Sequence, residues 1–362
     1  MGGTITTREF DLIRDFIAKE TSISLAEDKV YLVETRLSRI MVQEGIPDYF
    51  ALHEALQDTS RRTLRDRVID AMTTNETLWF RDSAPFDAFR DHLLPAYAAE
   101  ISEGKRDKIR IWSAASSTGQ EPYSLAMIFK EAVRSNPALK MEQLEIVASD
   151  LSDSALATAR AGVYSGIAMD RGLPPEFRLR YFVPKGDTYE ITDEIRNRVT
   201  FHKFNLQNSF ITMGKFDIVL TRYVLIYFED DFKREVLRKA NGALEKGGVL
   251  FLGSSESLPE KTPGYALIRR GRATWFQKSE AQKTGVGLSE VAPQVVAPPS
   301  VPVTKPVPAA PASRLPLNSS KPANSSTPPP VQSSQGGVDE ATSTLSEVMQ
   351  RLKAMNDKHS KK

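Results

Sequence analysis

A polar turn after an apolar run carries the residues best suited to ligand binding. Residues 109–114 read IRIWSA, which is typical of a buried strand, and residues 115–119 read ASSTG. Pro122 stands where the first turn of a helix tolerates proline. The turn has one glycine, Gly119, followed by an acid, Glu121, and lacks the three spaced glycines of a pyrophosphate loop. It favours a ligand with a cationic or hydroxyl-bearing end, at the carboxyl edge of a parallel sheet.

A second candidate residue is Asp150, which ends the apolar run LEIVASD. An acid at the end of the second strand of a nucleotide-binding sheet accepts hydrogen bonds from ribose hydroxyls. Aspartate is also a favoured N-cap, and a helix beginning near Ser152 offers that simpler role. Glu121 likewise suits the first turn of a helix, where the helix dipole favours an acid. Both alternatives stay open on the sequence alone.

The segment MTTNETLWFRD, residues 72–82, has an unusual composition for a connection between helices. Hydrogen-bonding side chains at 73–77 precede two aromatic residues, Trp79 and Phe80, and then Arg81. Turn formation explains the threonines and the asparagine, but not the residues after them. A guanidinium suits a carboxylate, so we expect Arg81 to orient one and the aromatic pair to help exclude water.

Alternating strands and helices must position these residues. Apolar runs predict strands at 109–114, 144–150, 216–222, 248–254 and 273–278, with helices between them. This pattern predicts an α/β fold with a doubly wound sheet. Residues 165–203 interrupt the alternation, and short alternating runs around 185–187 predict a small inserted antiparallel β-subdomain.

The first 75 residues predict an all-α domain. Apolar spacing indicates a helix capped by Thr6 or Thr7, followed by helices over 25–42, 50–56 and 64–72. Three basic residues recur at helical spacing on the second helix, namely Lys29, Arg36 and Arg39. Either a solvated face or a docking face explains them.

The composition changes near residue 280. Of the chain's 22 prolines, 12 lie within residues 293–330, so we expect a disordered linker over 280–337. Residues 338–362 predict a short amphipathic helix, whose apolar seam over 338–355 fits either a frayed end or a partner's docking segment. Residues 76–279 would then form the α/β domain.

The overall composition narrows the class of protein. The 362 residues carry a net charge of +2 and no cysteine, which excludes disulfides, thiolate-bound zinc and a thiol nucleophile. No signal-peptide pattern opens the chain, and no run approaches the roughly 20 apolar residues of a membrane helix. We expect a cytoplasmic protein that is not embedded in a membrane, with no metal and no nucleic-acid partner.

Five ordered motifs carry a family resemblance: TTNETLWFRD, AASSTGQEPYSLAM, ASDLS, FDIVLTRYVLIYF and LFLGSSESL. Over about residues 8–278 the chain resembles the chemotaxis-receptor methyltransferases (CheR). The resemblance implies an N-terminal helical domain, a class I methyltransferase domain with a mixed sheet, and S-adenosylmethionine as the methyl donor. It also implies a protein-glutamate O-methyltransferase that esterifies methyl-accepting chemotaxis receptors, releases S-adenosylhomocysteine, and is recruited to receptor arrays at the inner membrane.

The resemblance assigns roles to individual residues. Arg81 and Tyr227 match catalytic residues that orient the reacting groups, and Asn205 with Leu206 matches the pair beside the adenine. It implies that the basic helix with Lys29, Arg36 and Arg39 docks acidic receptor helices. The resemblance also implies that the methyl donor is contacted by Asn75, Thr77, Arg81, Glu121, Asp150, Asn205, Leu206, Arg222 and Tyr223.

The chain departs from the family pattern in three places. Tyr223 follows Arg222 where the family usually has asparagine, and Gln120 stands where glutamate is common. The loop in VPKGDTYEI is short for binding a receptor's C-terminal pentapeptide, which argues against tethering by that tail.

Alternative functions follow from these features. A nicotinamide-dependent dehydrogenase is disfavoured because the glycine fingerprint is incomplete. A methyltransferase for another protein substrate fits the same fold, and Tyr223 leaves room for a catalytically weakened, donor-binding adaptor of a chemosensory array. Glutamate is ionised at neutral pH and needs no general base, which agrees with four histidines that all lie outside the motifs.

Overall fold

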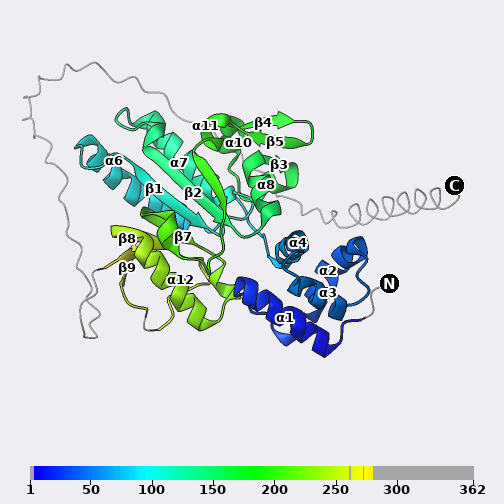
Figure 1. Cartoon of the computed structure of the whole chain (residues 1–362). Coiled ribbons are helices and arrows are strands. Elements are labelled where there is room, and N and C mark those ends of the chain that lie inside the picture. The colour runs from blue at the N-terminus through cyan, green and yellow to red at the C-terminus, as the bar shows by residue number, and fades with distance from the viewer. Residues whose placement is uncertain (1–3, 261, 272, 280–362) are drawn as a thin grey trace, which may run out of the picture. The chain divides into compact units, whose positions relative to one another are not determined.

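A four-helix N-terminal region precedes the sheet. The computed structural model describes residues 4–260, 262–271 and 273–279. The helices are α1 (Thr7–Thr21), α2 (Val30–Glu44), α3 (Tyr49–Gln57) and α4 (Arg62–Met72), with a 3₁₀ turn at Glu27–Lys29 before α2 (Figure 1). Thr6 caps α1 and forms a capping box with Glu9. The second helix begins five residues later than the predicted residue 25, because the 3₁₀ turn at Glu27–Lys29 precedes it.

The large sheet has seven strands in the order β6-β2-β1-β7-β8-β10-β9. The strands from β6 to β8 pair in parallel, and β10 runs antiparallel to both of its neighbours, β8 and β9. This order, with one reversed strand near the edge, is the class I methyltransferase arrangement and confirms the predicted fold. The strands are β1 (Ile109–Ala114), β2 (Leu144–Asp150), β6 (Val199–Lys203), β7 (Phe216–Thr221), β8 (Leu244–Phe251), β9 (Tyr265–Arg270) and β10 (Ala273–Lys278).

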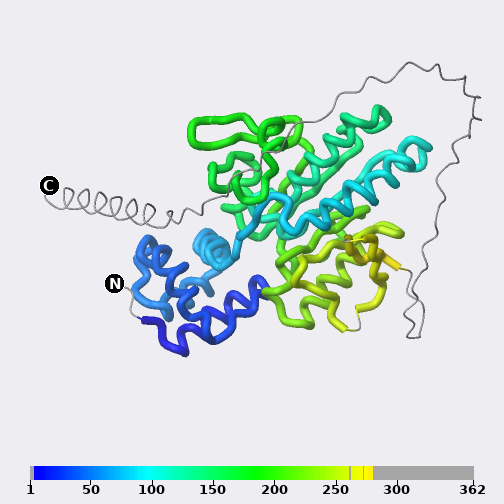
Figure 2. The backbone as a smooth tube through the Cα atoms, turned by 180° about the vertical axis from the view of Figure 1, so that it is seen from behind, coloured from blue at the N-terminus to red at the C-terminus, as the bar shows by residue number. Residues whose placement is uncertain are grey.

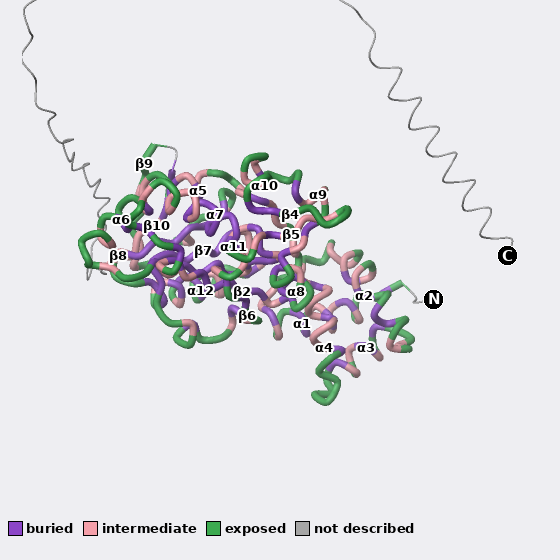
Figure 3. Tube along the Cα trace, turned by 90° about the horizontal axis from the view of Figure 1, so that it is seen from above, coloured by how far each residue is buried: buried purple, intermediate pink, exposed green. Residues whose placement is uncertain are grey.

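Helices cover both faces of this sheet. Ile111 of β1 belongs to the apolar core under α5 (Ala84–Ala88), α6 (Leu94–Ser102), α7 (Gln120–Ser135) and α8 (Asp153–Ala161). The next residue, Trp112, points to the opposite core, which α12 (Asp230–Ala243) covers. Figure 3 shows the strands as a buried layer between more exposed helices, and Figure 2 shows the N-terminal helices to one side of that layer.

The inserted β-subdomain is a three-stranded antiparallel sheet. Its strands β3 (Val163–Ser165), β4 (Phe182–Lys185) and β5 (Thr188–Ile191) lie in the order β3-β5-β4, with α9 (Gly166–Met169) and α10 (Pro175–Tyr181) between β3 and β4. The predicted hairpin is confirmed, but the predicted limits of 165–203 were wrong. β3 begins earlier, and β6 pairs with β2 in the large sheet.

Two strands of the large sheet, β8 and β9, differ from the sequence prediction by more than one residue, for local reasons. The strand predicted at 248–254 is β8, which begins four residues earlier, because the pair Gly247-Gly248 interrupts the apolar pattern beside a register shift against β7. β9 was not predicted, since this edge strand lacks buried residues and shows no alternation.

The expected linker over 280–337 and the helix over 338–362 lie outside the described residues. Among the helices that the structure describes, none is long and apolar enough to cross a membrane.

Candidate functional site

One pocket at the carboxyl edge of β1, β2 and β7 collects the predicted site residues. It holds about 930 Å³ of space, part of it open to solvent. Segments far apart in sequence reach it, from the end of α1 to the turn after β7. The ten predicted ligand and catalytic residues all line it: Asn75, Thr77, Arg81, Glu121, Asp150, Asn205, Leu206, Arg222, Tyr223 and Tyr227.

Asp150 is held by backbone amides at the end of β2. Its two carboxylate oxygens accept from Ser117 N at 2.7 Å and Ser152 N at 2.9 Å. Ser152, rather than Asp150, caps α8, because its hydroxyl accepts from Ala155 N. Burial raises the pKa of Asp150, and the amide hydrogen bonds oppose this only in part. The N-cap alternative is therefore wrong, and a buried carboxylate faces the pocket.

Residues 73–77 form one wall of this pocket and are held by hydrogen bonds on two sides. Asn75 Nδ2 donates to Ser152 Oγ at 3.0 Å, and Asn75 O accepts from Ser117 Oγ at 2.8 Å. On the other side, Arg36 Nη1 donates to Met72 O and Thr73 O, both at 3.0 Å. Arg36 Nη2 adds a hydrogen bond to Thr74 Oγ1 at 3.2 Å. Arg36 thus connects α2 with the pocket wall.

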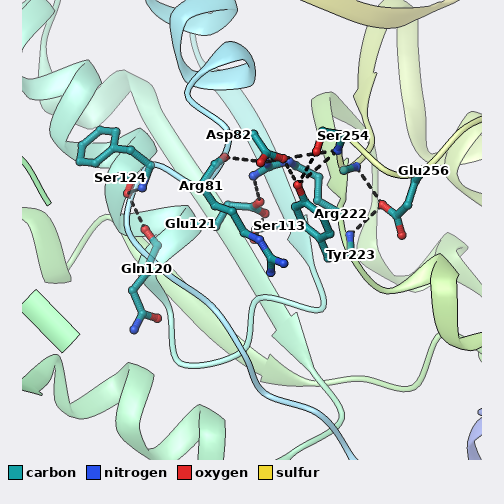
Figure 4. A network of polar contacts seen from close by, with 12 residues as sticks. Arg81, Asp82, Ser113, Gln120, Glu121, Ser124, Arg222, Tyr223, Ser254 and Glu256 are labelled. Atoms are coloured by element: carbon teal, nitrogen blue, oxygen red, sulfur yellow. Dashed lines mark hydrogen bonds and ion pairs between the residues drawn. The ribbon is translucent and has the colours of Figure 1, made fainter. Parts of the chain in front are cut away.

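Arg222 is the centre of a buried polar network (Figure 4). Its side chain is 2% exposed and forms ion pairs with Glu121 at 2.8 Å and Asp82 at 3.0 Å. It also donates to Arg81 O at 2.6 Å. Ser113 Oγ donates to the second carboxylate oxygen of Glu121. Glu121 is therefore more than a first-turn acid, because it compensates a buried guanidinium.

Tyr223 joins this network to the loop after β8. Its backbone lies in the left-handed region, with φ of 57°, and its amide donates to Glu256. The hydroxyl donates to Asp82 and lies 2.8 Å from Ser254 Oγ. Burial alone would raise the pKa of Asp82, but the Tyr223 hydroxyl and the Arg222 charge outweigh it and lower that pKa. Tyr223 therefore occupies a defined place rather than disrupting the turn.

Arg81 and Tyr227 lie at the same pocket but are held differently. The Arg81 guanidinium stacks 3.5 Å from the centre of the Tyr223 ring and donates to Glu76 O at 3.2 Å. Tyr227 ends a 3₁₀ turn, Leu225–Tyr227, and its carbonyl accepts from Ser24 N at 2.8 Å. Within the described chain, the Tyr227 hydroxyl has no hydrogen-bond partner.

The N-terminal region contributes directly to the pocket. Asn205 Nδ2 donates to Glu20 O at 2.7 Å, and Thr21 and Ile23 form part of the lining. Sequence reasoning missed these two residues, as it missed Asp82, Ser254 and Glu256. Asp82, Ser254 and Glu256 lie within the motifs FRD and GSSES. No periodic pattern in the sequence distinguishes them, because their partners in the site are distant in the sequence.

The expectation that Trp79 and Phe80 exclude water from the site was wrong. Neither residue lines the pocket. Trp79 is fully buried, with its ring 4.9 Å from that of Tyr164 and 5.3 Å from that of Phe182, and its Nε1 donates to Ala168 O. It joins the site segment to the β-subdomain instead.

Comparison with known proteins identifies the family. Residues 75–273 match the family domain described as "CheR methyltransferase, SAM binding domain", and residues 8–73 match "CheR methyltransferase, all-alpha domain". The chain belongs to the CheR methyltransferase family. A Pseudomonas aeruginosa relative, chemotaxis protein methyltransferase 1, is 45% identical over 72% of this chain and 94% of its own. The CheR relatives from Pseudomonas putida and Vibrio parahaemolyticus are each 42% identical, over 72% and 74% of this chain and 94% and 95% of their own.

The pocket of this CheR chain fits S-adenosylmethionine, which is its methyl donor. Ser116 Oγ and Arg222 Nε are buried without a hydrogen-bond partner among the described residues, and both side chains belong to the pocket lining. Such groups favour a polar ligand. Within the described part of the chain, no group of three or more histidine, aspartate or glutamate side chains could hold a metal ion.

Proposed function

We propose that this CheR protein methylates glutamate side chains of chemoreceptors and releases S-adenosylhomocysteine. The match to this chain covers almost the whole length of three relatives, and all three are named chemotaxis protein methyltransferases. One observation carries the proposal for the site: ten residues from separate segments meet in one pocket, whose lining contains no histidine. A carboxylate acceptor suits such a site, because it needs no general base.

One end of the pocket is proposed to hold the adenosyl group. Asp150 offers its remaining lone pairs to ribose hydroxyls, as acids at this sheet position do. Leu206 supplies an apolar surface for the adenine, and Asn205 anchors that segment to the end of α1. Asn75 and Thr77 close the pocket from the side of the N-terminal helices.

The opposite end is proposed to hold the reacting groups. The donor supplies a methyl group on a positively charged sulfur, so an acceptor oxygen gains the methyl while the carbon–sulfur bond breaks. Arg81 would pair with the acceptor carboxylate, and the unpartnered hydroxyl of Tyr227 would help align it. Glu121, Arg222 and Tyr223 would contact the donor and keep Arg81 in place. Alignment of this kind is worth up to about 7–11 kcal/mol.

The receptor is proposed to dock on the basic side of α2. Arg39 is exposed on α2 and can meet an acidic helix. Lys29, in the turn before α2, is partly exposed but forms an ion pair with Asp28 at 2.6 Å, which an acidic partner would have to share. Arg36 already donates to three acceptors of this chain, which makes it a support for the pocket wall. We also propose that domains end at residues 75, 279 and 337. The proposal further includes recruitment to receptor arrays at the inner membrane and a partner for residues 338–355.

The test is transfer of labelled methyl from S-adenosylmethionine to membranes enriched in cognate receptors. Base-labile label on the receptor supports a carboxyl methyl ester, and Arg81→Ala should nearly abolish the transfer while the protein stays folded. Donor binding without transfer to any receptor would favour the adaptor function instead. Methyl label that appears on another protein instead would favour a different substrate.

A further inference from the structure

The carboxylate of Glu256 binds the turn that leads from β7 to Tyr227. Its Oε2 accepts from Tyr223 N at 2.7 Å (Figure 4), and its Oε1 accepts from Leu225 N at 2.9 Å. Oε2 also accepts from Gly253 N at 2.8 Å, within the turn that carries Glu256 itself. One side chain therefore supplies acceptors to three backbone amides, and two of these amides lie in the segment that ends at Tyr227.

The backbone at Tyr223 depends on these contacts. A φ of 57° lies in the left-handed region, which is unfavourable for a residue with a bulky side chain. Val224, the next residue, begins the 3₁₀ turn without a side-chain cap of its own. Glu256 supplies acceptors to this turn from a loop 33 residues further along the chain. The conformation of Tyr223 is therefore maintained by a residue distant in sequence.

Gly253 allows the carboxylate to come this close. A Cβ on Gly253 would lie 2.8 Å from Glu256 Oε2 and 3.1 Å from the Tyr223 ring. The first contact is too short, so either the carboxylate or the backbone would have to shift. The loop after β8 and the turn after β7 therefore fit each other only while residue 253 has no side chain.

Both groups that are proposed to orient the acceptor depend on this turn. The Arg81 guanidinium lies 3.5 Å from the centre of the Tyr223 ring, and Tyr227 is the last residue of the 3₁₀ turn. At that end of the turn, Ser24 N donates to Tyr227 O at 2.8 Å. A shift of the segment at Glu256 would therefore move the ring under Arg81 and the Tyr227 hydroxyl together.

We propose that Glu256 is a positioning residue for methyl transfer, which acts through Tyr223 and Tyr227 on the acceptor carboxylate. The inference rests on the proposed function. Glu256 is half-buried and is not part of the donor pocket's lining, and its oxygens face backbone amides. Its effect on the reaction would therefore come from the geometry of the turn and not from contact with a substrate.

The donor end of the pocket should depend less on Glu256. Asp150 accepts from the amides of Ser117 and Ser152, and Asn75 donates to Ser152 Oγ. These bonds do not involve the loop after β8. A change at Glu256 should therefore slow methyl transfer more than it weakens donor binding.

The test compares two variants with a matched control. Glu256→Gln keeps the size of the side chain but has one acceptor oxygen, so at least one amide loses its acceptor. Gly253→Ala keeps the carboxylate and displaces it. Each variant should lower kcat for transfer to receptor-enriched membranes about tenfold or more, because a misplacement of about 1 Å can cost about 10²-fold. The KM for receptor and the affinity for S-adenosylhomocysteine should stay within about threefold. Glu260→Gln, the same change at an exposed position of the same loop, should alter none of these quantities.

Hydrogen–deuterium exchange measures the geometry without any reaction. The peptide covering residues 222–228 should exchange faster in Glu256→Gln than in the unmodified protein or in Glu260→Gln. Unchanged exchange would overturn the proposal. A lower Tm with kcat within twofold would also overturn it, since Glu256 would then only stabilise the fold, and so would a higher receptor KM at constant kcat. Failure of the proposed function is distinguishable, because the unmodified protein would then methylate no receptor, whatever the exchange shows.

Discussion

Replacement of Arg36 tests whether α2 supports the donor pocket. In Arg36→Ala, Met72 O, Thr73 O and Thr74 Oγ1 lose a charged donor. Because the site is half-exposed, water replaces part of each bond, and we take about 1 kcal/mol for each, or about 2–3 kcal/mol in the free energy of unfolding. In a folded unit of this size that lowers Tm by roughly 3–5 °C. The pocket wall at 73–77 would also be held less firmly around Asn75. Donor binding should therefore weaken about fivefold to tenfold, which corresponds to about 1–1.4 kcal/mol.

The assay pairs thermal unfolding with calorimetric titration of S-adenosylhomocysteine. Arg39→Ala is the matched control, because Arg39 lies on the same helix but is exposed and has no partner among the described residues. It should leave Tm and donor affinity unchanged and raise only the KM for receptor. Arg36→Lys keeps the charge but lacks the forked donors, so it should recover only part of the lost Tm and of the lost donor affinity. Donor affinity within twofold of the unmodified protein in Arg36→Ala would refute the reasoning.

Three further predictions concern the site. Tyr223→Phe keeps the stacking on Arg81 but loses the hydroxyl contacts, so kcat should fall about threefold, and more in Tyr223→Ala, as steady-state kinetics would show. Because the pKa of Asp150 is raised, its carboxylate gains a proton at a higher pH than an ordinary aspartate, whose pKa is about 3.9. On acidification, the affinity for S-adenosylhomocysteine should therefore begin to fall above that pH. Asp150→Asn should bind S-adenosylhomocysteine more weakly, with an affinity that does not change with pH in that range. Trp79→Ala should destabilise the protein by about 3–5 kcal/mol in denaturant unfolding, and an unchanged midpoint would contradict the packing described.

The sequence predicted the parts of this fold that depend on local periodicity. β1, β2 and β10 begin and end as predicted, because each is a continuous apolar run with clear ends. β9 was missed because this edge strand has no buried residue, and the early start of β8 was missed because the pair Gly247-Gly248 interrupts the apolar pattern. The limits of the insertion were wrong because β6 is short and pairs with β2, a partner distant in sequence.

For the candidate site, too, local sequence patterns predicted some features and missed those that depend on contacts distant in sequence. The motifs named residues that meet in one pocket, but they did not show how those residues are held. Arg36 was interpreted as a docking cation because helical spacing reveals only that it shares a face with Lys29 and Arg39. Its bonds to Met72 and Thr73 depend on how α2 packs against α4. Trp79 was misplaced for a similar reason, since its neighbours lie in the insertion.

The contact of Trp79 with the insertion limits how such enzymes can be recombined. Trp79 N donates to Arg171 O at 3.1 Å, and a Cβ on Gly172 would lie 2.3 Å from Trp79 O. The β-subdomain and the strip that carries Arg81 therefore fit each other through backbone atoms as well as side chains. A chimaera that exchanges residues 163–191 with a relative should also exchange residues 76–81. Grafting the insertion alone would place mismatched contacts next to Arg81, the arginine proposed to orient the acceptor.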